Sequence, residues 1–139
     1  MSEVEQLYAE TQMMEEMAVR LNADMRRAAA AVEEAAAAVS AIKSLRDGQE
    51  SEVLLQLGMG AMLRAHLPSV ERIPVDVGAG VVIEKSPDAA INYLEIRIKE
   101  LKVSLEEMAA RRDQVVGSVE QKRRRLEELA KSAQAAPNT

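Results

Sequence analysis

Two segments of this chain carry apolar residues at the alternating three- and four-residue spacing of a coiled coil, and this pattern limits the possible folds more than any other feature. The first segment is apolar at every such position except Thr11, and its positions are Val4, Leu7, Thr11, Met14, Ala18, Leu21, Met25, Ala28, Val32, Ala35, Val39 and Ile42. The second is apolar at all but Arg112 and Lys122, and its positions are Ile91, Leu94, Ile98, Leu101, Leu105, Met108, Arg112, Val115, Val119, Lys122, Leu126 and Leu129. The sequence therefore predicts two long helices with narrow apolar seams.

The two seams match when they run in opposite directions. This alignment places Val4 opposite Leu129, and each layer then pairs an a position with a d position, as in antiparallel neighbours. It also puts Thr11 opposite Lys122, so that one layer holds both polar residues. We therefore expect an antiparallel helical hairpin. A parallel coil shared by two chains is the alternative, because heptads alone do not fix orientation.

Local signals mark the ends of the helices. Basic residues precede Gly48, which favours a helix C-terminus with the glycine in the left-handed conformation. Ser86, followed by a proline and an aspartate, is typical of a helix N-terminus. We interpret the chain as a single domain with these elements: a helix at 3–47, two β-hairpins at 52–85, a helix at 86–133 and a frayed tail at 134–139.

Composition favours long helices over a compact globule and excludes several functions. Hydrophobic residues make up 47% of the chain, but Tyr8 and Tyr93 are its only aromatic residues, whereas a globular core normally relies on aromatic side chains. The net charge of −5 argues against a general polyanion binder. The absence of cysteine excludes disulfides and thiolate metal sites. Because no membrane span or signal-like start is evident, a cytoplasmic location is expected.

The segment between the helices contains four short apolar runs, EVLLQL, AMLRAHL, RIPVDV and GVVIEK, separated by glycine or proline. Such runs are typical of strands. Alternation places these residues on one face of their strands: Val53, Leu55 and Leu57; Leu63, Ala65 and Leu67; Ile73, Val75 and Val77; Val81 and Ile83.

Two hairpins of this size are not stable alone, because each has unpaired edges and one apolar face. The missing strands must come from other subunits, so these apolar faces are the expected oligomer interface. The predicted fold class is α+β dominated by α. It consists of a long antiparallel coiled-coil hairpin with two β-hairpins inserted between the helices, and the β-hairpins assemble into a shared sheet or an oligomeric β-barrel body.

Two Gly-x-Gly motifs raise the question of a phosphate site: Gly58 with Gly60, and Gly78 with Gly80. A Rossmann fingerprint needs a third glycine between a strand and a helix, and a P-loop needs Gly-Lys-Ser/Thr. Here each motif is followed by apolar residues that continue as a strand. We therefore interpret the four glycines as turn residues with positive φ, and we expect no cofactor and no metal.

The order of the elements, the motifs LGMG and VGAG in the hairpins, and the run VVIEKSPDAAINYLEIRIKEL resemble the prefoldin family, in particular archaeal subunits of the alpha type. The resemblance covers nearly the whole chain and is strongest from Val53 to Leu101. Two hairpins match the alpha type, since the beta type has one. Two positions depart from the family: Gln56, where proline is frequent, and Pro74, which interrupts the third strand and leaves its pairing open.

The resemblance implies a hexamer of two alpha-type and four beta-type subunits, with a double β-barrel body and projecting coiled coils. It also implies an ATP-independent holdase, not an enzyme, that binds nonnative polypeptides and transfers them to a group II chaperonin. Neither nucleic acid nor membrane is an implied partner. The alternative function is a structural coiled-coil adaptor that joins folded partners.

The open end of the helical hairpin, called the tip here, is the expected site for nonnative polypeptides. Methionine is frequent there, and its flexible side chain suits a surface that accepts many apolar shapes. A frayed helix end with ordinary seam residues is the alternative interpretation. The candidate client-binding residues are Val4, Leu7, Tyr8, Met13, Met14, Met17, Leu126 and Leu129.

His66 and the basic run from Lys122 to Arg125 are the remaining candidates for chemistry. One histidine in a chain without cysteine does not make a zinc site, and no catalytic triad can be assembled from it. We therefore expect His66 at a surface or a strand edge. In the antiparallel register the basic run lies beside Glu3, Glu5, Glu10, Glu15 and Glu16, so a salt-bridged helix surface is favoured over a nucleic-acid site.

Overall fold

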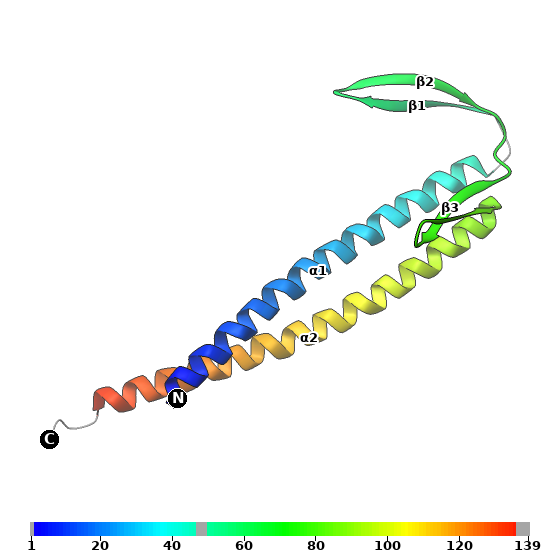
Figure 1. The fold of residues 1–139 in the computed structure, drawn as a ribbon. Coiled ribbons are helices and arrows are strands. Elements are labelled where there is room, and N and C mark those ends of the chain that lie inside the picture. Colours follow the sequence, from blue (N-terminus) through cyan, green and yellow to red (C-terminus); the bar gives the residue numbers. More distant parts are fainter. Residues whose placement is uncertain (1, 47–49, 136–139) are drawn as a thin grey trace. The chain divides into compact units, whose positions relative to one another are not determined.

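The computed structural model describes residues 2–46 and 50–135 of the 139-residue chain. Two long helices flank four strands in the order of the sequence (Figure 1). The expected helical pair with two inserted β-hairpins is confirmed. The elements are α1 (Glu3–Leu45), β1 (Ser51–Gly58), β2 (Ala61–Leu67), β3 (Ile73–Gly78), β4 (Val81–Lys85) and α2 (Pro87–Ala135).

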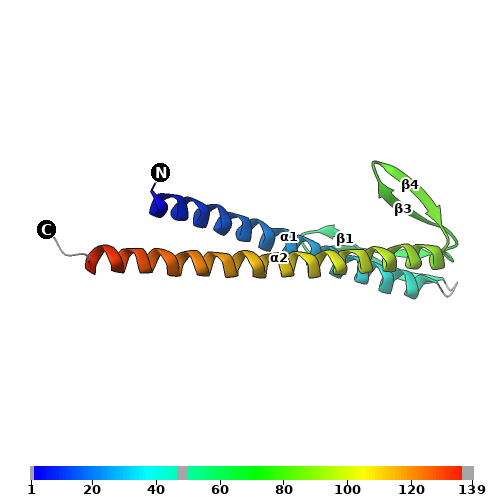
Figure 2. The same cartoon turned by 90° about the horizontal axis from the view of Figure 1, so that it is seen from below.

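The observed helix limits differ from the predicted ones. α2 continues without interruption to Ala135 (Figure 2), two residues beyond the predicted helix end at 133. The final turn is rich in alanine, which has the highest helix propensity, and this explains the longer helix. Residues 136–139 lie outside the described part of the chain, as do residue 47 and the predicted cap Gly48. Within residues 2–46 and 50–135, neither helix contains an apolar stretch that could span a lipid bilayer.

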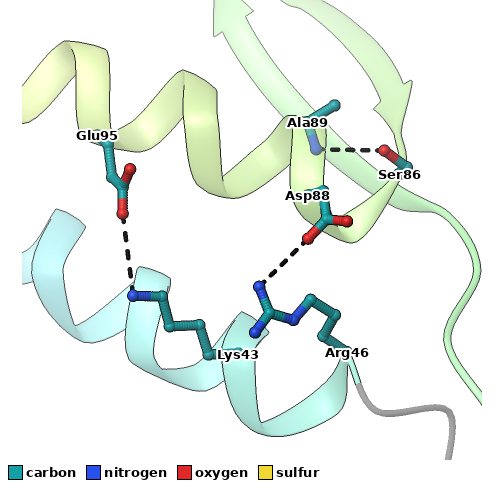
Figure 3. Close-up of polar contacts among 6 residues, drawn as sticks. All are labelled: Lys43, Arg46, Ser86, Asp88, Ala89 and Glu95. Carbon is teal, nitrogen blue, oxygen red and sulfur yellow. Dashed lines mark hydrogen bonds and ion pairs between the residues drawn. The ribbon is translucent and has the colours of Figure 1, made fainter.

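Both helices begin with side-chain caps. Ser86 Oγ accepts a hydrogen bond from the Ala89 amide at 3.2 Å, and Pro87 occupies the first helical position (Figure 3). Residue 86 is therefore the cap and not part of the helix. At the start of α1, Ser2 Oγ accepts from the Glu5 amide while the Glu5 carboxylate accepts from the Ser2 amide. This reciprocal pair is a capping box, which the sequence prediction did not use.

The contacts of the chain fall into two compact units. The first unit comprises Met1–Ala30 with Lys102–Thr139, and the second unit is Ala31–Leu101. In the first unit, the segments of α1 and α2 pack in opposite directions, and every predicted seam position is buried or half-buried except Val4. The seams predicted from the heptad spacing therefore form the contact between these segments.

The core of the second unit joins the helices to β3. Its partly buried margin includes Ile73 and Val75 of β3. Apolar residues from α1, α2 and one strand thus share one interior. The buried cluster consists of Val39, Ile42, Ala90 and Ile91. Two interhelical ion pairs, drawn in Figure 3, lie in the same unit: Lys43–Glu95 at 3.9 Å and Arg46–Asp88 at 3.3 Å.

The strands form two separate antiparallel hairpins, β1 with β2 and β3 with β4. In the first, Val53 lies opposite Ala65 and Leu55 opposite Leu63, so the predicted apolar residues of both strands share one face.

The register of the second hairpin runs through its proline without a shift. Pro74 lies opposite Glu84, and Val75 lies opposite Ile83. In a two-stranded hairpin every strand is an edge strand, and proline is tolerated at a strand edge because it lacks only a backbone donor. The pairing that the sequence left open is therefore regular at Pro74.

Each hairpin turns through a two-residue loop. Met59 and Gly60 have φ values of 51° and 81°, and Ala79 and Gly80 have φ values of 53° and 75°. Positive φ at both central residues is the signature of the type I′ turn, whose twist matches that of the flanking strands. The glycines before the turns, Gly58 and Gly78, also have positive φ and lie at register shifts. Both Gly-x-Gly motifs are thus strand-to-strand turns.

Candidate functional site

The tip consists of residues 3–20 of α1 and the facing residues of α2 in the first unit. Tyr8 is 60% exposed, Met13 is 66% exposed and Val4 is also exposed. The other predicted client-binding residues are half-buried in or beside the seam: Leu7, Met14, Met17, Leu126 and Leu129. The structure therefore separates the predicted set into outward-facing residues and residues that hold the helices together.

Val19 is a tip residue that the sequence prediction missed. Its side chain is 66% exposed, although it lies next to the seam position Ala18. It lines a hollow of about 600 Å³ together with Gln12, Glu15, Glu16 and Arg20. Val19 is therefore an apolar side chain among charged residues on the outer side of α1. The sequence could have indicated Val19, because it is an aliphatic residue that does not follow the seam spacing.

The basic run of α2 is neutralised by acidic residues. Lys122 Nζ lies 3.1 Å from Glu10 Oε2, and Arg123 forms an ion pair with Glu15. The remaining two arginines of the run, Arg124 and Arg125, also contact glutamates. This pairing supports the expected salt-bridged surface and leaves little free charge for a polyanion.

Arg125 anchors the first turn of α1. Its Nη2 lies 3.1 Å from Glu3 Oε1. The hydrogen bond and the charge of Glu3 raise the pKa of Arg125 above its ordinary value. The guanidinium of Arg125 therefore keeps its positive charge at neutral pH.

A polar layer lies within the seam near the tip. Thr11 is buried, and its Oγ1 donates a hydrogen bond of 2.7 Å to the carbonyl oxygen of Leu7 one turn earlier. Lys122, the residue predicted to face Thr11, directs its ammonium to Glu10. Both polar groups are therefore satisfied without a direct bond between them. Two apolar layers, those of Val4 and Leu7, remain beyond this polar layer.

The hairpins expose apolar side chains on the faces predicted for oligomer contact. Five of the predicted residues are exposed: Leu55, Leu57, Leu63, Val81 and Ile83. The others are half-buried: Val53, Leu67, Ile73, Val75 and Val77. For Ile73 and Val75 the structure supplies a partner within the chain, the core of the second unit. Substitutions there would therefore disturb folding as well as assembly.

The opposite faces of the hairpins also carry apolar residues, which the alternation argument missed. Leu54 and Met62 are exposed on the face of the first hairpin that also holds Gln56 and Arg64. Val82 is exposed on the corresponding face of the second hairpin. The signal was present as runs of adjacent apolar residues, LL, ML and VV, which are typical of strands covered on both faces.

His66 lies on an exposed part of β2. Its Nε2 is 3.1 Å from Glu50 Oε2, which gives it a polar partner at the open end of the first hairpin. Within residues 2–46 and 50–135, no group of three potential metal ligands comes together. The arrangement of His66 is that of a surface residue.

Comparison with known proteins agrees with this architecture. A family model described as prefoldin subunit matches residues 14–136. The prefoldin subunit alpha of Nitrosopumilus maritimus is 33% identical over 132 residues, covering 95% of this chain and 91% of that protein. The prefoldin subunit alpha of Methanospirillum hungatei is 29% identical over 104 residues, covering 75% of this chain and 70% of that protein.

A solved structure shares the fold. The cryo-EM structure of filamentous PFD from Methanocaldococcus jannaschii matches with a TM-score of 0.70 at 20% identity, covering 82% of this chain and 95% of that chain. The family model spans most of the sequence, and the relative from Nitrosopumilus maritimus spans nearly all of it. On this evidence, the chain belongs to the prefoldin family of chaperones and is similar to its archaeal alpha-type subunits.

Proposed function

We propose that this chain is the alpha-type subunit of an ATP-independent holdase whose tips bind nonnative polypeptides. Family membership supports the chaperone function. The observation that carries the assignment to the tip is the exposure of Tyr8, Met13 and Val19 on α1, because none of the three is needed to hold the helices together. The free energy falls when an unfolded chain covers these apolar side chains and removes them from water.

The proposal includes assembly with beta-type subunits, in the ratio of two alpha to four beta. The exposed apolar residues of both hairpins support it, since a two-stranded hairpin with an uncovered apolar face is not stable alone. Several tips held by one body would bind one polypeptide at several points, so that weak contacts add by avidity. We further propose transfer of the bound chain to a group II chaperonin, a cytoplasmic location and no catalytic step.

The tip assignment is tested by a triple variant, Tyr8→Ser, Met13→Gln and Val19→Gln, in the assembled complex without ATP. We expect it to lose most of its ability to suppress aggregation of a denatured model protein, while the mass of the complex and its helical content stay unchanged. Light scattering measures the aggregation. A matched control replaces Ile96 and Val103 by glutamine, because both are exposed apolar residues of α2 outside the tip.

Equal protection by the triple variant and the wild type would move the client site away from the outer side of α1. A wild-type complex that does not suppress aggregation at all would instead contradict the holdase function and favour the structural adaptor.

A further inference from the structure

A shallow hollow of about 300 Å³ lies in the first unit, away from the tip. Its polar rim is formed by Asn22 and Arg26 of α1 and Arg112 of α2. Its apolar floor is formed by Met25, Ala29 and Leu105. Residues of both helices therefore line one site across the seam.

The charges at this hollow depart from the pattern of the rest of the first unit. Elsewhere in that unit the ion pairs between α1 and α2 join opposite charges, as in Glu10–Lys122 and Glu15–Arg123. Here two arginines, Arg26 and Arg112, line the same hollow, and no acidic residue lines it. Two like charges at one site repel each other, and an anion between them would remove that cost.

Neither arginine is neutralised inside the hollow. Among the described residues Arg26 has no acidic partner, whereas its neighbour Arg27 pairs with Asp24. Arg112 contacts Asp113 of the same helix at 3.3 Å, but that side chain is 73% exposed, so the pair is weak and easily exchanged. Arg112 Nη1 also lies 3.9 Å from Met25 Sδ, so the guanidinium contacts an apolar residue of the hollow.

We propose that this hollow binds a carboxylate flanked by aliphatic side chains, as in a peptide segment that alternates acidic and apolar residues. The planar guanidinium donates two parallel hydrogen bonds to a carboxylate, and the amide of Asn22 adds a second type of donor. The floor of Met25, Ala29 and Leu105 accepts the neighbouring aliphatic group, and methionine adapts to its shape. This site is separate from the outward-facing tip residues and does not depend on client capture there.

The probe is a dansylated ten-residue peptide of alternating leucine and glutamate, titrated into the assembled complex and followed by fluorescence anisotropy. We expect Arg26→Gln to weaken binding about tenfold, and Arg26→Lys to restore part of it, because a charge without the planar fork keeps only the Coulomb attraction. Arg27→Gln is the matched control. It removes the neighbouring guanidinium, which does not line the hollow, and it should leave the dissociation constant unchanged.

A charge reversal separates binding from stability. Arg26→Glu places opposite charges across the seam, so it should abolish peptide binding while the melting temperature stays equal or rises. The proposal is overturned if Arg26→Gln and Arg26→Glu bind the peptide as the wild type does. It is also overturned if a peptide of alternating leucine and lysine binds equally well, or if inorganic phosphate at the same concentration displaces the acidic peptide completely.

Discussion

At the residue scale, two turn positions hold side chains in an unfavourable backbone conformation. Met59 and Ala79 have φ values of 51° and 53°, a region that residues other than glycine, asparagine and aspartate rarely occupy. A type I′ turn requires positive φ at both central positions. In each hairpin glycine occupies only the second of these positions. The glycine at the second central position therefore favours each turn, and the residue at the first central position has a strained backbone.

Replacement of Ala79 by asparagine should stabilise the second hairpin. Asparagine adopts the left-handed conformation more readily than alanine, so we expect the free energy of unfolding to rise by about 0.5 to 1 kcal/mol. Thermal unfolding of the full-length protein at fixed concentration measures the change. Ala79→Val is the opposing control, because a β-branched residue resists positive φ and should lower the melting temperature. Identical melting temperatures for both variants would contradict the strain.

At the scale of elements, the two helices hold each other through a seam of small and aliphatic residues interrupted by polar ones. Thr11 and Lys122 form a polar layer of the seam within the tip. Lys122 keeps only 23% of its side chain exposed and needs Glu10 as a partner. A polar residue at a seam position lowers stability while it specifies the pairing of the helices.

An apolar replacement of this layer should therefore strengthen the helix pair. For the double variant Thr11→Val with Lys122→Leu, we expect a gain of about 1 kcal/mol in the free energy of unfolding, because aliphatic contacts replace a half-buried charge. Circular dichroism during thermal unfolding measures it. Lys102→Leu is the control, since that side chain is exposed on α2 and should add no stability. A destabilised double variant would show that the Lys122–Glu10 pair outweighs the apolar gain.

At the scale of the whole molecule, the described chain buries few hydrophobic side chains for its length. They are Leu21, Val39, Ile42, Ala90, Ile91 and Val119. Large apolar side chains on both hairpins are exposed to solvent. A domain of this size normally buries well over half of the surface that its unfolded chain exposes. We therefore expect other subunits to cover the exposed apolar faces of the hairpins.

A charge on an exposed hairpin face should break assembly without unfolding the helices. Leu55→Asp would require burial of a carboxylate against a partner strand, at a cost of several kcal/mol. We expect the mass of the complex, measured by light scattering after size-exclusion chromatography, to fall while helical content is kept. Gln56→Asp on the same strand is the control for the opposite face. An unchanged mass for Leu55→Asp would contradict the interface, and loss of assembly in both variants would show that both faces are covered.

The helices, strands and turns of this protein can be predicted from the sequence alone, because their signals are local. Heptad spacing locates the seams, Ser86 with Pro87 marks the start of α2, and the Gly-x-Gly motifs produce turns through the conformational freedom of glycine. The helix end at Ala135 was missed because alanine-rich helix persists where no seam is present.

Which apolar faces pack within the chain and which stay exposed depends on the three-dimensional fold. The apolar spacing of β3 does not say whether Val75 packs on its own helices or on another subunit, and the fold places it against the chain's own core. The placement of Arg26 and Arg112 at one hollow depends on how each helix is rotated about its axis and on the alignment of the two helices across the seam. Such contacts join residues far apart in the sequence, so no local pattern records them.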